Sequence, residues 1–179
     1  MLGSNQQKEL LNTRALKDGG GVHDPDFECF RNVTSENPHI LDVGANRGQS
    51  IVSFKAVFFQ STIDSFEANP FFFPILQNVG KWFDGITIHS YGLGGTNTSL
   101  EFFVPVVDGN AYLEEGSTKR ESFESDWVKK RLASYGANLK FDVFPVEIRT
   151  ATSVLGDKAI DIVKIDVEGA ELDVLSSMG

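Results

Sequence analysis

A short apolar segment followed by two closely spaced glycines constrains the fold of this chain more than any other feature. Residues 40–43 (Ile-Leu-Asp-Val) are apolar except for one acid, which is typical of a buried parallel strand. Gly44 and Gly48 bracket a tight turn, and residues 49–58 then have the apolar spacing of a helix. A strand, a glycine-rich turn and a helix indicate the first unit of a nucleotide-binding α/β fold. The glycines let a ligand approach the backbone, and the helix N-terminus offers unpaired N–H groups.

The turn differs from the glycine pattern of dinucleotide-binding folds. Its glycines are spaced G-x-x-x-G rather than G-x-G-x-x-G, so the cradle for a pyrophosphate is incomplete. Asp42, just before the turn, would repel a diphosphate and suits a cationic or amine-bearing ligand better. This combination resembles the first motif of Rossmann-like methyltransferases that use S-adenosylmethionine. A glycine-bounded turn that holds no ligand is the alternative.

Size and charge limit the classes of protein and partner. The 179 residues fit one domain with its own core, and most of the 15 phenylalanines should lie in it. The net charge of -9 argues against a nucleic acid or an anionic membrane as partner. The single cysteine, Cys29, excludes an internal disulfide and a cysteine-based zinc site. Because the sequence shows no signal peptide and no bilayer-spanning apolar run, we expect a cytoplasmic location.

A second strand over residues 62–67 ends in an acid that is a candidate ligand contact. Glu67 lies roughly twenty residues beyond the glycine turn, where an acid in this architecture accepts hydrogen bonds from the two ribose hydroxyls. A solvent-exposed acid at the strand end is the alternative. Asn69 and Pro70 then predict the N-cap and first residue of the next helix.

A third strand is expected over residues 86–89, followed by a flexible glycine-rich turn. Ligands of open α/β sheets bind at the carboxyl ends of strands, so Gly92 and Leu93 are candidates to border an adenine ring. A plain loop is the alternative. Strands over residues 100–106 and 141–148, with a helix over 121–135 between them, then interrupt the alternation of strand and helix. We expect this middle section to carry the elements that recognise the substrate.

The last strong signal is a strand over residues 160–165, followed by a helix that begins at Glu171. Lys164 and Asp166 are two residues apart and point to the same side of the strand. A lysine inside a central strand needs an acidic partner, which either Asp42 or Asp166 could supply. Three carboxylates lie near the strand end: Asp166, Glu168 and Glu171. They form either an active-site edge or a helix N-terminus stabilised by acids.

Three blocks together resemble the FkbM family of methyltransferases: residues 42–48 (DVGANRG), 65–70 (SFEANP) and 164–171 (KIDVEGAE). The resemblance covers roughly residues 38–179, which would form the methyltransferase domain, whereas residues 1–37 would form an N-terminal arm with short helices. It implies a mostly parallel α/β sheet of the Rossmann-like class I methyltransferase type. It also implies S-adenosylmethionine as methyl donor and a small-molecule or carbohydrate hydroxyl as acceptor, with O-methylation of a sugar or polyketide hydroxyl.

Residue roles follow from the same resemblance. The cofactor contacts that it implies are Gly44, Asn46, Gly48 and Glu67. Asp42 beside the turn, and Gly92 and Leu93 after the third strand, are further expected contacts because of their positions. Asp166 would lie at the reaction edge, and Asp166 or Glu168 is the candidate general base for an alcohol acceptor. No set of carboxylates is clear enough to predict a metal site.

Two departures from the family pattern stand out. Ala151 and Thr152 occupy the place of a common Leu-Asp pair, so any role of that aspartate is in doubt. The chain also stops at Gly179, after the fourth core strand, whereas methyltransferases of this class have three more strands. We therefore expect either a truncated gene product or a shortened member that completes its sheet by association. The free strand edge would favour self-association.

Two other functions remain open from the sequence. A non-catalytic module that binds S-adenosylmethionine would fit a sheet that lacks its last strands. A nicotinamide-dependent oxidoreductase is disfavoured by the G-x-x-x-G turn and by Asp42.

Overall fold

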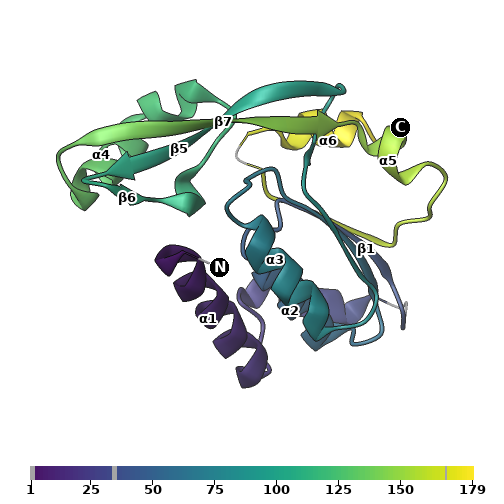
Figure 1. Ribbon diagram of the computed structural model, residues 1–179. Coiled ribbons are helices and arrows are strands. Elements are labelled where there is room, and N and C mark those ends of the chain that lie inside the picture. Colours follow the sequence, from purple (N-terminus) through teal and green to yellow (C-terminus); the bar gives the residue numbers. More distant parts are fainter. Residues whose placement is uncertain (1–2, 34–35, 168) are drawn as a thin grey trace.

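Four parallel strands form the sheet that positions the candidate site (Figure 1). The structure is a computed structural model, and it describes residues 3–33, 36–167 and 169–179. The strands are β1 (His39–Val43), β2 (Thr62–Phe66), β3 (Ile86–His89) and β8 (Ile162–Ile165), in the spatial order β3–β2–β1–β8. Val43 at the end of β1 pairs with Phe66 of β2 and with Ile165 of β8. The carboxyl ends of these strands therefore meet at one edge, and the loops that follow them are neighbours.

Both faces of this sheet are covered, which explains the apolar run in β1. Successive side chains of a strand point to opposite faces. Ile40 packs in a core cluster with side chains of α2 and α3, whereas Leu41 packs in a second cluster with side chains of α5 and α6. These helices are α2 (Gln49–Val57), α3 (Phe73–Val79), α5 (Ala151–Leu155) and α6 (Glu171–Ser176). The mostly parallel α/β sheet predicted from the sequence is confirmed.

The N-terminal segment packs on this core. Helix α1 (Ser4–Gly19) lies against α2 and α3, and its Thr13 is buried. The 3-10 helix η1 (Pro25–Asn32) follows, with the carboxylate of Asp24 accepting a hydrogen bond from the Asp26 N–H at 2.9 Å. Helix α1 thus packs on the domain core through α2 and α3. No helix in the described residues combines the length and apolar character needed to cross a membrane.

The middle of the chain forms a second sheet in the order β4–β7–β5–β6. Its strands are β4 (Gly92–Leu93), β5 (Thr98–Val107), β6 (Asn110–Ala111) and β7 (Leu139–Arg149). In Figure 1, β5 and β7 form a long ribbon with α4 (Asp126–Tyr135) near one end and with α5 and α6 near the other. The 3-10 helices η3 (Leu113–Glu115) and η4 (Arg120–Glu124) precede α4, and η2 (Gly80–Trp82) follows α3.

Three local predictions were wrong. Helix α3 begins at Phe73 and not at Pro70, because the Asn69 side chain accepts a hydrogen bond from the Phe71 N–H and forms a turn. The helix expected over 121–135 breaks at Ser125, whose extended backbone and hydroxyl cap α4. The last strand begins at Ile162 rather than at residue 160, and α5 was not anticipated.

Candidate active site

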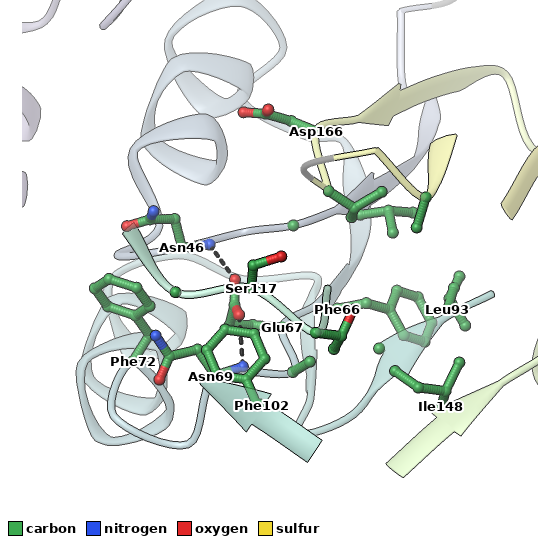
Figure 2. Close-up of a pocket in the computed structure, with 18 of the residues that line it drawn as sticks. Asn46, Phe66, Glu67, Asn69, Phe72, Leu93, Phe102, Ser117, Ile148 and Asp166 are labelled. Atoms are coloured by element: carbon green, nitrogen blue, oxygen red, sulfur yellow. Dashed lines mark hydrogen bonds between the residues drawn. The ribbon is translucent and has the colours of Figure 1, made fainter. Parts of the chain in front are cut away.

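One cavity lies at the carboxyl edge of the parallel sheet (Figure 2). We call it the cofactor cavity, after the cofactor contacts that the sequence predicts there. The predicted site residues that line it are Gly44, Asn46, Glu67, Gly92, Leu93 and Asp166. They come from the loops after β1, β2 and β8 and from the short strand β4. The sequence motifs therefore converge in space, although they are far apart along the chain.

Two other predicted residues, Asp42 and Gly48, do not line this cavity. Glu168 lies outside the described residues.

Glu67 is fixed by hydrogen bonds from two loops. One carboxylate oxygen accepts a hydrogen bond from the Asn46 N–H at 2.7 Å, and the other accepts one from the Asn69 N–H at 2.7 Å. Burial raises the pKa of the carboxyl group, and these two backbone donors only partly oppose that rise. Glu67 is thus an enclosed acid, not the solvent-exposed strand-end acid that was the alternative. Each oxygen keeps a further lone pair for a hydroxyl donor.

Gly44 is required by a close approach of two strand ends. Its backbone has a φ of +79°, and a Cβ atom there would lie 2.0 Å from the carbonyl oxygen of Asp166. The loops after β1 and β8 therefore touch at this position. A side chain at Gly44 would collide with Asp166 first, before it could fill space meant for a ligand.

Gly48 has a structural role next to the site. It precedes α2 with a φ of +88°, and a Cβ atom there would lie 3.1 Å from the Val79 side chain of α3. Close packing of the turn on α3 therefore explains this glycine. The prediction that Gly48 contacts the cofactor receives no support from this placement.

Asp42 lies on the sheet face covered by α2 and is fully buried. Its Oδ2 accepts hydrogen bonds from the hydroxyls of Ser50 at 2.7 Å and Ser65 at 3.0 Å. Its Oδ1 lies 3.3 Å from the Lys164 ammonium group, which also donates to the Gly44 carbonyl at 2.6 Å. Asp42 thus supports the turn from beneath. The expectation that Lys164 needs an acidic partner is confirmed.

Asp166 reaches the rim of the cavity, but its carboxylate points elsewhere. Its side chain is 72% exposed and lies 3.8 Å from the Lys164 ammonium group. Figure 2 shows the carboxylate well apart from Glu67 and directed away from it. In this arrangement Asp166 does not face the enclosed part of the cavity. Among the described residues, no group of three or more His, Cys, Asp or Glu side chains is placed to hold a metal ion.

The opposite wall comes from the middle section of the chain and includes Phe102, Ser117 and Ile148. Residues 113–119, which we call the closing segment, cross this wall. The sequence indicated the region as a recognition element but gave no signal for these individual residues.

The closing segment is attached to all three loops at the sheet edge. The Asn69 side-chain amide donates to the Leu113 carbonyl at 3.0 Å. Arg47, in the turn after β1, forms an ion pair with Glu114. The Lys119 ammonium group donates to the Gly169 carbonyl in the loop after β8. These contacts enclose the cofactor cavity between the two sheets.

Comparison with known proteins places this geometry in context. The family model described as "Methyltransferase FkbM domain" matches residues 42–179. "Methyltransferase 1" of Beauveria bassiana (strain ARSEF 2860) is 30% identical over 152 residues, which cover 80% of this chain and 59% of that protein. "Methyltransferase sdnD" of Sordaria araneosa is 28% identical over 160 residues, covering 79% and 61%. The chain thus spans about three fifths of the length of these relatives.

A solved structure shares the fold. The crystal structure of the methyltransferase FkbM from Methylobacillus flagellatus KT superposes with a TM-score of 0.50 at 17% sequence identity. The match covers 79% of this chain and 29% of the other. At this identity the similarity concerns the fold alone.

Proposed function

Because the chain belongs to the FkbM methyltransferase domain family, we propose that it binds S-adenosylmethionine in the cofactor cavity and takes part in methyl transfer. The observation that carries this proposal is the enclosed Glu67 carboxylate at the end of β2. It is held by backbone N–H groups of Asn46 and Asn69, with acceptor capacity left over.

The residues of the cavity fit this cofactor chemically. Glu67 would accept hydrogen bonds from the ribose hydroxyls. The apolar side chains of Leu93 and Ile148 line the same cavity as Glu67 and suit an adenine ring. Gly44 and Asn46 would border the part of the cofactor nearest the turn after β1.

The chain's own part in the reaction is orientation and exclusion of water. S-adenosylmethionine, when bound, supplies a methyl group that its sulfonium has already activated. The closing segment, tied to the loops by Asn69, Arg47 and Lys119, would shield this site from solvent.

The acceptor proposed is a hydroxyl of a sugar or polyketide-type molecule. Methylation of a hydroxyl releases its proton, and a positioned carboxylate would take it. Asp166 remains the candidate for this role. Its exposed carboxylate would have to turn away from Lys164 toward the acceptor.

A non-catalytic cofactor-binding module is the second candidate function. It is favoured by the exposure of Asp166, since a base in solvent does not face the acceptor. The two candidates share the same cavity and differ only in whether transfer occurs.

Calorimetric titration tests the shared part of both proposals. We expect S-adenosylhomocysteine to bind and NADH not to bind; the reverse preference would contradict both. Incubation with labelled S-adenosylmethionine and a panel of sugars and polyketide-type alcohols then separates them. Label in an ether product supports the enzyme, and binding without transfer supports the module.

A further inference from the structure

A second cavity lies beside the cofactor cavity, between α1, the residues that follow β6, and α4. We call it the outer cavity. Its volume is about 330 Å³, within the range of small-molecule sites, roughly 300–1,000 Å³. Leu113 and Glu114 line both cavities. A molecule in the outer cavity would therefore adjoin a cofactor in the first.

Arg47 fixes the outer cavity relative to the turn after β1. Its guanidinium group pairs with Glu114 on one side and lies 3.4 Å from Glu9 of α1 on the other. Its backbone carbonyl also accepts a hydrogen bond from the Thr13 hydroxyl of α1 at 3.3 Å. Both acids line the outer cavity. Arg47, in the turn after β1, thus contacts Glu9 on one wall of the outer cavity and Glu114 on another.

The wall formed by α4 is held rigidly by aromatic and ionic contacts. The rings of Tyr112 and Tyr135 stack in parallel, with centroids 4.0 Å apart. Arg131 lies 2.6 Å from the Glu115 carboxylate and donates a hydrogen bond to the Tyr135 hydroxyl at 3.0 Å. This wall therefore offers aromatic surface next to a positioned carboxylate.

The opposite wall carries an oxygen without a hydrogen-bond donor. Oε2 of Glu9 is buried and accepts no hydrogen bond from the described residues, although Arg47 lies within ion-pair distance. Because this oxygen has almost no accessible surface, it forms part of the wall beside Arg47 and is not offered to a ligand in the cavity. Asn5 and Asn110 add side-chain amides to the same cavity.

The charges of the outer cavity balance. Its carboxylates are Glu9, Glu114 and Glu115. Its cations are Lys8 and Arg131, with Arg47 as the ion-pair partner of two of the acids. Such a cavity attracts neither an anion nor a cation strongly. Carboxylate and amide groups can bond to hydroxyls, and a tyrosine ring can pack against a C–H face.

We propose that the outer cavity binds the methyl acceptor, and that this acceptor is an uncharged ring-shaped molecule with several hydroxyl groups, of about monosaccharide size. This inference rests on the proposed function, because it assigns the second substrate of the same reaction. It adds α1 and α4 to the substrate-binding elements. The reacting hydroxyl would have to extend past Leu113 and Glu114 into the cofactor cavity, which Asp166 lines.

Saturation-transfer NMR on the full chain with S-adenosylhomocysteine present tests the inference. The probes are methyl α-D-glucopyranoside, the negatively charged glucuronate and the positively charged glucosamine. We expect transfer to the neutral glycoside, and much weaker transfer to either charged sugar. Absence of transfer to the neutral glycoside, or a clear preference for a charged one, would overturn the inference.

Variants assign the binding to this cavity. Glu115→Gln should weaken glycoside binding about tenfold, as expected for loss of a charged hydrogen-bond acceptor. Asn110→Ala is a second test variant. Because Asn110 lies on β6, away from α4, it keeps the test decisive if Glu115→Gln disturbs α4. Glu124→Gln, an exposed residue paired with Lys129 outside the cavity, is the matched control. Unchanged binding in both test variants would place the acceptor elsewhere.

Titration with S-adenosylhomocysteine distinguishes failure of the proposed acceptor site from failure of the proposed function. If every variant binds S-adenosylhomocysteine like the wild type but no glycoside binds, the acceptor site is wrong and the proposed function stands. If wild type fails to bind S-adenosylhomocysteine, the proposed function fails, and the acceptor inference is overturned with it.

Discussion

Replacement of Gly44 by alanine tests the close contact between the loop after β1 and the loop after β8 at the carboxyl edge of the sheet. Gly44 combines a φ of +79° with a Cβ position only 2.0 Å from the Asp166 carbonyl oxygen. The left-handed backbone alone costs a non-glycine residue roughly 1–2 kcal/mol. Forcing a methyl group into closely packed surroundings costs about 1–3 kcal/mol more. The sum for Gly44→Ala is about 2–5 kcal/mol of unfolding free energy.

Gly109→Ala is a matched control for this prediction. Gly109 has a φ of +83°, but a Cβ atom there would meet no heavy atom within 4 Å. It should therefore lose only the backbone part, roughly 1–2 kcal/mol.

Urea unfolding followed by tryptophan fluorescence gives both free energies, because Trp82 packs against the main core cluster. Gly44→Ala should also lower the affinity for S-adenosylhomocysteine, because the turn after β1 and the loop after β8 would move apart. If Gly44→Ala and Gly109→Ala unfold at the same urea concentration, the proposed contact with Asp166 is wrong.

Four further predictions concern other parts of the domain. Glu67→Gln should weaken S-adenosylhomocysteine binding by roughly 1.5–3 kcal/mol in calorimetry, because a charged acceptor is lost; equal affinity would remove Glu67 from the site. Asp42→Asn leaves the Lys164 ammonium group without its buried partner and should cost about 3 kcal/mol of unfolding free energy in urea titrations, whereas unchanged stability would refute the supporting role. Hydrogen bonds from His89 and His39, together with Lys158, lower the pKa of Asp64. Its stabilisation is therefore present above the unfolded pKa, near pH 4, and lost on further acidification, so thermal melts of Asp64→Asn should depend less on pH there than those of the wild type. Val163 is exposed on the edge strand β8, so we propose that the chain self-associates through this edge, and Val163→Lys should lower the mass seen by light scattering at high concentration.

The parallel sheet could be predicted because its signals are local. The apolar run of β1, the glycines of the following turn and the acid at the end of β2 each determine nearby backbone or side-chain placement. The paired strands then bring the three loops together in register. For this reason the sequence could place Glu67 at the carboxyl edge of the sheet, where it lines the cavity.

The roles of Asp42 and Gly48 depend on contacts that the sequence does not display. Asp42 points to the face of α2 because side chains alternate along a strand, and it finds Ser50, Ser65 and Lys164 there. Gly48 is explained by the distance between its backbone and α3. Both residues lie in the block of residues 42–48, and their packing contacts explain why these residue types occur there.

The second sheet and the closing segment could not be placed from the sequence. The pairing of β5 with β7 joins residues from 32 positions apart, Val107 with Leu139 at one end, to 50 positions apart, Thr98 with Ile148 at the other. The contact between Arg47 and Glu114 likewise depends on how the two sheets meet. No local pattern in either segment specifies its partner.

Binding at the cofactor cavity is tested most directly by titrating the ¹⁵N-labelled chain with S-adenosylhomocysteine and following its backbone amides. The amides of Asn46 and Asn69 donate to the Glu67 carboxylate, so a ligand on that carboxylate must change their surroundings. We predict large, saturable shifts of these two resonances, with the amide of Lys129 on α4 unaffected. Saturating ligand that leaves Asn46 and Asn69 unchanged would contradict the assignment of this cavity to the cofactor.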